Sequence, residues 1–115
     1  MARVVVVEAH TIPERPPFRL AVGDVVSVGR RDQEWPAFVF VTGSEGSGWV
    51  PARHLSSESG RATAIAAYDT TELPTSVGDM LEVVTRDDEA GWLWCRSADG
   101  REGWVPARTV EPADE

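Results

Sequence analysis

The chain contains an internal repeat. The hexapeptide Gly48-Trp49-Val50-Pro51-Ala52-Arg53 returns unchanged 55 positions later, at 103–108. Val22-Gly23-Asp24 and Arg31-Asp32 return at the same offset. Six identical residues that include Trp and Pro rarely coincide by chance, so the 115 residues hold two copies of one unit. A unit of about 55 residues can bury only a small core, which restricts the architectures open to it.

The predicted boundary between the copies lies in a polar segment. Residues 56–60 contain three serines and end in glycine, as a linker does. We therefore predict a first domain at 1–55, a linker at 56–60, a second domain at 61–111 and an acidic tail at 112–115. Five residues span at most about 17 Å, so the two domains are expected to lie close together.

Each copy is predicted to be all-β. Segments 25–28 and 80–84 are rich in β-branched residues and follow a Gly-Asp turn. Segments 38–41 and 92–96 follow as further strands, and Asp99-Gly100 is a tight-hairpin signal. No segment shows a sustained period of 3.6 residues, so little helix is expected. Many short strands at close spacing favour a small barrel.

Composition restricts the classes of molecule that the chain is expected to bind. The formal net charge is −8 and the sequence pI is about 4.7. This charge disfavours nucleic acid and anionic membranes and favours basic or neutral partners. Cys95 is the single cysteine, so no internal disulfide can form. The apolar run at 4–7 is too short for a signal peptide, and no stretch is long enough to span a membrane, so a cytoplasmic location is expected.

At these residues the chain resembles the SH3 family. Ala66-Ala67-Tyr68-Asp69-Thr70 is similar to the family's A-L-Y-D-Y, and Glu72-Leu73 followed by Gly78-Asp79 is similar to E-L-S-F-x-x-G-D. Gly91-Trp92 resembles the strand with the groove tryptophan, and residues 103–110 resemble G-Y-V-P-S-N-Y-V. The first copy shows the same frame in weaker form. The resemblance implies two tandem SH3-like small β-barrels joined by a short linker, as in bacterial variant SH3 proteins.

Strand alternation predicts the core of each barrel. In the first domain the predicted core residues are Val4, Val6, Phe18, Leu20, Val26, Val28, Val41, Val50 and Leu55. In the second they are Ala64, Ala66, Leu73, Leu81, Val83, Cys95, Val105 and Val110. Cys95 is interpreted as a small core hydrophobe, with a reactive thiol as the alternative.

The resemblance predicts which loop differs between the copies. If Val6 is matched with Ala66, the offset grows from 55 to 60 in the segment that corresponds to the RT loop of SH3 domains. The first domain keeps the longer loop, residues 11–17, whereas the second has only Thr70-Thr71. In the family this loop walls one side of the ligand groove, so the second groove is expected to be shallower.

The resemblance also implies groove residues. An SH3 groove stacks rings against a polyproline II peptide, and acidic loop residues hold its Arg or Lys. In the second domain Tyr68, Trp92 and Pro106 match groove positions, with acidic Asp69 and Glu72 beside them, while Thr70 and Thr109 replace tyrosines. In the first domain only Pro51 matches cleanly. Glu8, His10 and His54 stand where tyrosines would be, and the groove tryptophan is replaced by Phe38 or by Trp35, of which Phe38 fits the strand pattern better.

Two further features are candidate contact sites. Trp94 with Trp104, and Phe40 with Trp49, are predicted cross-strand pairs that point away from the core. Such pairs stabilise a hairpin, pack the domains together, or dock a partner, and these three interpretations stay open. The acidic run Asp87-Asp88-Glu89 corresponds to the family's n-Src loop, and it is either a solvated loop or a gate for basic peptides.

No catalytic or cofactor motif is evident. His10 and His54 are the only histidines, which is too few for a metal site with one cysteine, and no phosphate-binding loop or nucleophile–base set stands out. We therefore expect a protein that is not an enzyme and uses no cofactor. The first hypothesis is an adaptor that binds proline-containing or basic peptides, through its second domain. The alternative is an assembly protein whose barrels pack together or form a homodimer, and binding of cell-wall peptide is a third option that needs an export signal.

Overall fold

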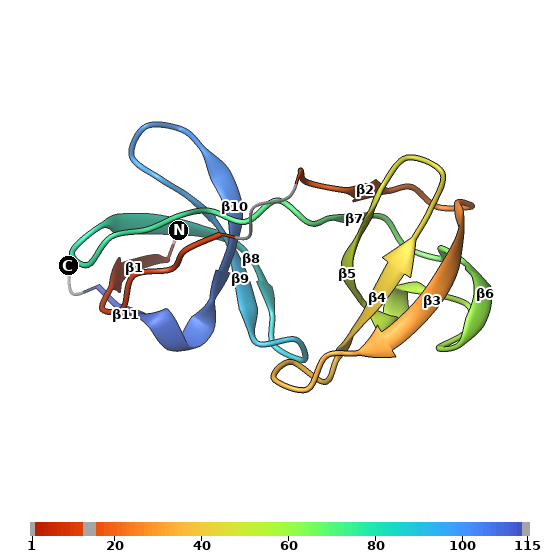
Figure 1. The fold of residues 1–115 in the computed structure, drawn as a ribbon. Helices are drawn as coiled ribbons and strands as arrows, with labels where there is room; N and C mark the ends of the chain where they lie inside the picture. The colour runs from red at the N-terminus through yellow and green to blue at the C-terminus, as the bar shows by residue number, and fades with distance from the viewer. Residues whose placement is uncertain (1, 13–15, 114–115) are drawn as a thin grey trace. The chain divides into compact units, whose positions relative to one another are not determined.

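The computed structural model describes residues 2–12 and 16–113. Residues 13–15 of the expected longer loop, and 114–115 of the acidic tail, lie outside this range. The described chain is built from short strands and two 3-10 turns (Figure 1). None of its segments is a helix long and apolar enough to cross a membrane. The strands are β1 (Arg3–Val6), β2 (Arg19–Leu20), β3 (Val25–Arg31), β4 (Phe38–Thr42), β5 (Ser47–Pro51), β6 (Gly60–Thr63), β7 (Tyr68–Asp69), β8 (Met80–Asp87), β9 (Trp92–Arg96), β10 (Glu102–Pro106) and β11 (Val110–Pro112).

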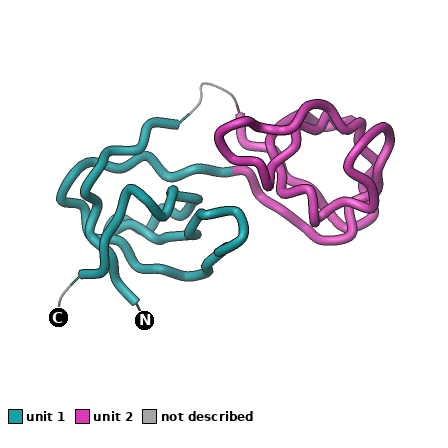
Figure 2. The backbone as a smooth tube through the Cα atoms, turned by 90° about the horizontal axis from the view of Figure 1, so that it is seen from below, with its two compact units in different colours: residues 1–15, 71–115 teal, residues 16–70 magenta. Residues whose placement is uncertain are grey.

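The chain divides into two compact units that do not follow the predicted domain boundaries. Unit 2 is the continuous segment Pro16–Thr70, and unit 1 combines Met1–Arg15 with Thr71–Glu115 (Figure 2). The predicted linker at 56–60 therefore lies inside unit 2. There the Ser56 amide donates to the Thr63 carbonyl at 2.9 Å, and Gly60, with φ of 67°, begins β6. The polar composition marks a turn, which has the same chemistry as a linker.

The difference arises because the two copies exchange their first strands. In unit 1 the strand order is β10-β9-β8-β1-β11, so β1 from the start of the chain completes a sheet of the C-terminal copy. In unit 2 the order is β5-β4-β3-β6, so the corresponding strand of the second copy completes the first. The remaining pair, β2 with β7, lies within unit 2. The resulting sheets of five, four and two strands are open and do not close into barrels.

Strand register gives the correspondence between the copies. Val4 lies opposite Leu81 in unit 1, and Ala62 lies opposite Val26 in unit 2. Val6 in turn corresponds to Ala64, since these two face Val110 and Leu55 respectively. The first strands are thus 58 residues apart, and the matching of Val6 with Ala66 was wrong by two residues.

Most predicted core residues are buried, but Val4, Val6, Ala64 and Ala66 lie in a different unit from the one predicted. Val4 and Val6 pack with Leu73 and Leu81 in unit 1, and Ala64 packs with the core of unit 2. Alternation correctly indicated which side chains turn inward, yet it carries no information on which sheet a strand joins. Three predicted residues, Val28, Ala66 and Val110, are only half-buried, and the buried residues Val39, Ala62 and Leu93 were missed.

Core volume gives a physical reason for the exchange. Unit 2 has the bulkier frame, with Phe18, Leu20 and Leu55 where unit 1 has Leu73, Thr75 and Val110. Across the eight corresponding inward positions, unit 2 holds four more side-chain heavy atoms than unit 1. The two inward residues of β1 are valines, whereas the corresponding residues Ala62, in β6, and Ala64, just after β6, are alanines, a difference of four heavy atoms in the opposite sense. The observed exchange therefore equalises the two cores, whereas the sequential arrangement would overfill one and leave the other underpacked.

Candidate functional site

Three rings gather beside a proline in unit 2. Tyr68 lies edge-on to His54 at 5.2 Å between ring centroids and edge-on to Phe38 at 6.4 Å. Pro51 faces Phe38 across the β4–β5 ladder. We call Phe38, Pro51, His54 and Tyr68 the unit 2 ring cluster. Phe38 and Pro51 are buried, whereas Tyr68 and His54 are half-buried. The rings of Tyr68 and His54 are therefore the part of the cluster that is exposed to solvent.

The backbone fixes each ring of this cluster. Pro51 ends β5 and is followed by the 3-10 turn Ala52–His54, which places His54 next to the strand. His54 is held from two sides, because its Nδ1 lies 3.1 Å from the Ala67 carbonyl and its own carbonyl accepts from the Ile65 amide at 2.8 Å. Tyr68 lies in β7, which pairs with β2 through Leu20. The cluster thus depends on residues 65–69 of the second copy, which the strand exchange brings to unit 2.

Asp69 follows the ring cluster along the chain. Its carboxylate accepts from Arg19 Nε at 3.2 Å, and Arg19 is 83% exposed. An ion pair this open is weak and exchanges easily with other cations. The Asp69 side chain is 30% exposed.

Unit 1 holds the corresponding positions in different chemistry. His10 takes the place of Tyr68 and lies edge-on to Trp92 at 5.4 Å, while Thr109 takes the place of His54. His10 Nε2 lies 2.8 Å from a Glu72 oxygen. Trp92 is only 9% exposed, and Thr109 is buried with its hydroxyl donating to the Pro106 carbonyl at 2.7 Å. This second cluster is more enclosed and has two rings instead of three.

The structure therefore separates the predicted groove of the second domain. Tyr68 and Asp69 lie in unit 2, whereas Trp92, Pro106 and Glu72 lie in unit 1. Phe38 faces Pro51 as Trp92 faces Pro106, so Phe38, and not Trp35, has the strand partner that corresponds to that of Trp92. The sequence could not reveal this separation. Ala67-Tyr68-Asp69 is continuous along the chain with Glu72, and the boundary between the two units falls between them, at 70/71.

The acidic loop is partly structural. Asp87 is 8% exposed and its carboxylate accepts from the Ala90 amide at 3.1 Å, which closes the turn before Trp92. Asp32 does the same in unit 2, accepting from the Glu34 amide at 2.9 Å. Asp88 and Glu89 are exposed. The gate interpretation of this loop therefore loses Asp87 and keeps two carboxylates.

The outward aromatic pairs form as predicted. Phe40 lies opposite Trp49, with ring centroids 5.1 Å apart, and Trp94 lies opposite Trp104, with centroids 5.2 Å apart. Both pairs are edge-on and half-buried. They differ in what surrounds them. In unit 2 the Arg30 guanidinium lies over both rings, 5.8 Å from Phe40 and 5.2 Å from Trp49.

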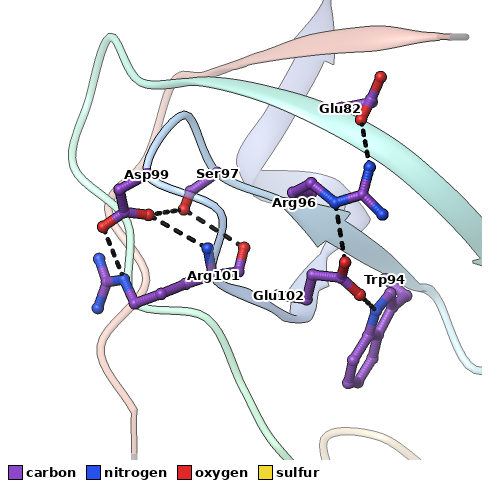
Figure 3. A network of polar contacts seen from close by, with 7 residues as sticks. All are labelled: Glu82, Trp94, Arg96, Ser97, Asp99, Arg101 and Glu102. Atoms are coloured by element: carbon purple, nitrogen blue, oxygen red, sulfur yellow. Dashed lines mark hydrogen bonds and ion pairs between the residues drawn. The ribbon is translucent and has the colours of Figure 1, made fainter.

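In unit 1 a polar network holds Trp94, one ring of the corresponding pair (Figure 3). Trp94 Nε1 donates to Glu102 at 2.8 Å, and Arg96 bridges Glu102 at 2.8 Å and Glu82 at 2.9 Å. The indole and guanidinium donors hold the pKa of Glu102 below its usual value, the indole bond first. Glu82, Arg96 and Glu102 form one row across β8, β9 and β10.

Charge is concentrated in unit 1. It holds 13 of the 19 acidic residues and 6 of the 11 arginines, so its formal net charge is −7 against −1 for unit 2. A field of one sign on a small unit attracts cations and accelerates association with basic partners. Unit 2 offers the more accessible rings and unit 1 the stronger negative potential.

The single cysteine belongs to the core of unit 1. Cys95 is fully buried, and burial raises the pKa of its thiol to about 11, so it stays protonated as a core residue. Across residues 2–12 and 16–113, no three His, Cys, Asp or Glu side chains gather to hold a metal.

The comparisons with known proteins agree with the resemblance. Residues 65–107 match the SH3 domain family. The chain is 31% identical to "SH3 and PX domain-containing protein 2B" of Mus musculus and 30% identical to the Homo sapiens protein of that name, in each case over 93% of this chain and 13% of the relative. It is 40% identical to "SH3 domain-containing protein Dlish" of Drosophila melanogaster over 42% of this chain and 13% of that protein. No solved structure matches.

These matches show that residues 65–107 are similar to an SH3 domain. The matched segment 65–107 crosses the boundary between the units at 70/71. The residues that match the SH3 pattern are therefore not the same as the residues of either compact unit. The chain spans about an eighth of the mouse and human relatives, since 13% of each is covered.

Proposed function

We propose that the chain is a non-catalytic interaction module that binds an extended, proline-containing peptide on the unit 2 ring cluster. The observation that carries this proposal is the contact of Tyr68 with both Phe38 and His54 beside Pro51. Proline-rich segments are already extended before binding, so they lose little entropy, and flat rings supply the surface on which proline packs.

Accessibility favours unit 2 over unit 1 for this role. The resemblance to SH3 domains suggests peptide binding by the second domain through Tyr68, Trp92 and Pro106, and of these Tyr68 belongs to unit 2. The unit 1 cluster is more enclosed, because Thr109, which takes the place of His54, is buried and the His10 side chain, 14% exposed, lies against Glu72. Asp69 gives the unit 2 site a preference for a peptide that carries an Arg or Lys near its prolines, because a carboxylate next to the rings attracts a basic side chain.

Peptide titration with a matched pair of variants tests the proposal. Proline-rich peptides with one Arg are titrated into the whole chain while amide and indole signals are followed by NMR. Tyr68→Ala is expected to weaken binding at least about tenfold, since a stacked ring contributes roughly 0.5–1.5 kcal/mol beyond its buried area. His10→Ala, the change at the corresponding position of unit 1, is expected to leave the affinity within about twofold.

The opposite response of the two variants would also identify the peptide site. If His10→Ala weakens binding and Tyr68→Ala does not, the peptide site lies in unit 1. If no peptide shifts any signal at millimolar concentration and light scattering shows a dimer, the assembly role replaces peptide binding as the better account.

A further inference from the structure

Each unit exposes three large apolar side chains beside one of its turns. In unit 2 they surround the turn that precedes β3, and in unit 1 they surround the turn that precedes β8. We call them the unit 2 patch, Val22, Val25 and Ile65, and the unit 1 patch, Val77, Met80 and Val7. All six are 43–68% exposed, and they are six of the eight large hydrophobic residues exposed in the described chain. Single exposed apolar residues are ordinary, whereas three together in each of two units mark a contact surface.

Backbone hydrogen bonds bring the members of the unit 2 patch together. The Gly23 amide donates to the Ala64 carbonyl at 2.8 Å, and Val22 and Ile65 are the next residues on the two paired segments. Val25 begins β3 three residues after Val22, in the ladder with β6. The patch therefore covers the place where the strand from the second copy meets the turn of the first.

Unit 1 repeats this arrangement. The Gly78 amide donates to the Val6 carbonyl at 2.8 Å, with Val77 and Val7 as the next residues, and Met80 begins β8. In both turns the glycine has a φ of 96°, and the aspartate that follows it accepts an amide at 2.9 Å. The exchange of first strands thus preserves the same apolar patch on both units.

Neither turn requires an apolar residue for its own stability. Val22 and Val77 occupy the first central position of turns that are closed by the Asp24 and Asp79 amides at 3.0 Å. Turn positions favour small or polar residues such as Gly, Pro, Asn, Asp and Ser. Both valines are 68% exposed, so they add little to either core. The stability of the separate units therefore does not account for a valine at this position in both.

A second copy of the chain offers a surface that matches these patches in size and chemistry. All six side chains are uncharged, so one patch can cover the other without burying an unpaired charge. Each patch exposes roughly 300 Å² of side chain, the lower end of the range for functional patches. Two copies that bury both patches of each chain would remove about 1,200 Å², which reaches the lower limit of stable specific interfaces.

Charge selects which patches meet. The formal net charge is −7 for unit 1 and −1 for unit 2. Contact between two unit 1 patches would oppose −7 with −7, whereas contact between a unit 1 patch and a unit 2 patch opposes −7 with −1. Contact between two unit 2 patches would leave both unit 1 patches exposed. The mixed contact is therefore the one that covers every patch with the least repulsion.

We propose that the chain self-associates by packing the unit 1 patch of one copy against the unit 2 patch of a second copy. The contact uses none of the residues of the unit 2 ring cluster, so it does not depend on the peptide site proposed above. Each chain carries a formal net charge of −8, so repulsion between copies opposes the contact. Salt screens this repulsion, and association is expected to strengthen as salt rises.

Sedimentation equilibrium of the whole chain measures the self-association. The average mass is expected to rise above that of one chain between about 10 μM and about 1 mM, as suits an interface at the lower size limit. The dissociation constant is expected to fall at least about threefold from about 0.05 M to about 0.5 M NaCl. A mass that stays at one chain throughout would overturn the proposal and assign the patches to a different partner.

The internal repeat supplies a matched pair of variants. Val22→Asp and Val77→Asp place one carboxylate at the same turn position of unit 2 and unit 1, where a polar residue suits the turn. A mixed contact needs both kinds of patch, so each variant alone is expected to weaken self-association at least about tenfold. An equimolar mixture of the two variants keeps one intact patch of each kind and is expected to form a complex of two chains. A variant that self-associates as strongly as the unchanged chain would overturn the mixed contact.

A third variant controls for charge. Val84 is 40% exposed in β8 of unit 1 and lies outside the patch, so Val84→Asp is expected to change the dissociation constant less than about twofold. Dispersed indole signals in the NMR spectrum check that each variant is folded. Equal losses in Val84→Asp and Val77→Asp would reduce the effect to net charge and overturn the contact. Tyr68→Ala is expected to leave self-association unchanged, so failure of this contact and failure of the peptide site are distinguishable.

Discussion

Units 1 and 2 share one strand plan and fill it from different parts of the chain. Unit 2 is continuous over Pro16–Thr70, whereas unit 1 is assembled from both ends. Unit 2 combines a bulky frame with the small residues Ala62 and Ala64, and unit 1 combines a smaller frame with Val4 and Val6. The comparison teaches that sequence repeats and folding units are set by different forces. Duplication sets the repeat, and the fit of each strand to a core sets the unit.

The same comparison holds at the surface. Unit 2 presents rings around Tyr68 and a cation over its outward pair, with a nearly balanced charge. Unit 1 encloses Trp92 and surrounds its outward pair with acids. Two nearly identical frames thus offer one apolar and one acidic surface, so the corresponding residues of each serve as controls for the other.

Removal of the first strand is expected to have the largest effect. Without residues 1–10, unit 1 loses β1 from the interior of its five-stranded sheet and should lose its cooperative fold. Unit 2 contains every member of its own core and should stay folded. In the NMR spectrum the indole signals of Trp92, Trp94 and Trp104 are expected to collapse, while Trp35 and Trp49 stay dispersed. The reverse pattern would show that β1 belongs to the first copy.

Opposite changes of core volume, a decrease in unit 1 and an increase in unit 2, should each destabilise only the unit that carries them. Val6→Ala leaves a cavity in unit 1 and is expected to cost about 2 kcal/mol of its unfolding free energy. Ala64→Val adds two methyl groups to the tightly filled core of unit 2 and is expected to cost about 1–3 kcal/mol there. Chemical denaturation followed through the separate indole signals measures each loss. A Val6→Ala variant that destabilises unit 2 instead would contradict the exchange.

Two corresponding glycines give a smaller, graded difference. A Cβ at Gly103 would meet the backbone of Glu72 and Leu73 at 2.8 Å, where the incoming chain pairs with Trp104. A Cβ at Gly48 would meet the side chain of Thr70 at 3.2 Å, which can shift. Gly103→Ala is therefore expected to cost about 1–3 kcal/mol and Gly48→Ala less than half of that, as measured by denaturation. Equal costs would mean that the close approach of residues 71–73 is wrong.

The smallest predicted effect concerns acid. Because Trp94 and Arg96 hold the pKa of Glu102 below its ordinary value of 4.5, its charged form stabilises unit 1. This contribution is present above that ordinary value and disappears as the pH falls through the lower, folded-state pKa. Glu102→Gln should flatten the loss of unit 1 stability below about pH 4.5, and leave unit 2, which has Ser47 at this position, unchanged. Acid titrations of the unchanged chain and of Glu102→Gln, monitored by the Trp94 and Trp49 indoles, would measure this difference. An identical acid response of unit 1 in the two chains would refute the prediction.

Much of this architecture can be predicted from the sequence, and what cannot has a definite cause. The repeat, the all-β content, the inward positions and the two aromatic pairs follow from period and spacing, which are local properties. The partner of β1 does not, because the same Val4 and Val6 pattern suits either sheet, and core volume is a property of the assembled units.

The candidate site shows the same limit. Phe38 could be assigned to the tryptophan position from its strand pattern, since register is preserved within a hairpin. Tyr68 could not be assigned to Phe38 and His54, because its motif is contiguous with Glu72 and Leu73, which belong to the other unit. The Arg30 cation over Trp49 was also missed, although the difference between Arg30 and Thr85 in otherwise matched strands could have drawn attention to it.

The most direct test of the strand exchange is a nuclear Overhauser measurement between methyl groups in dilute solution. Val4 lies opposite Leu81, and Ala62 opposite Val26. The exchange predicts strong cross-peaks from Val4 to Leu81 and from Ala62 to Val26. Cross-peaks from Val4 to Val26 and from Ala62 to Leu81 would place each strand in its own copy and contradict the account.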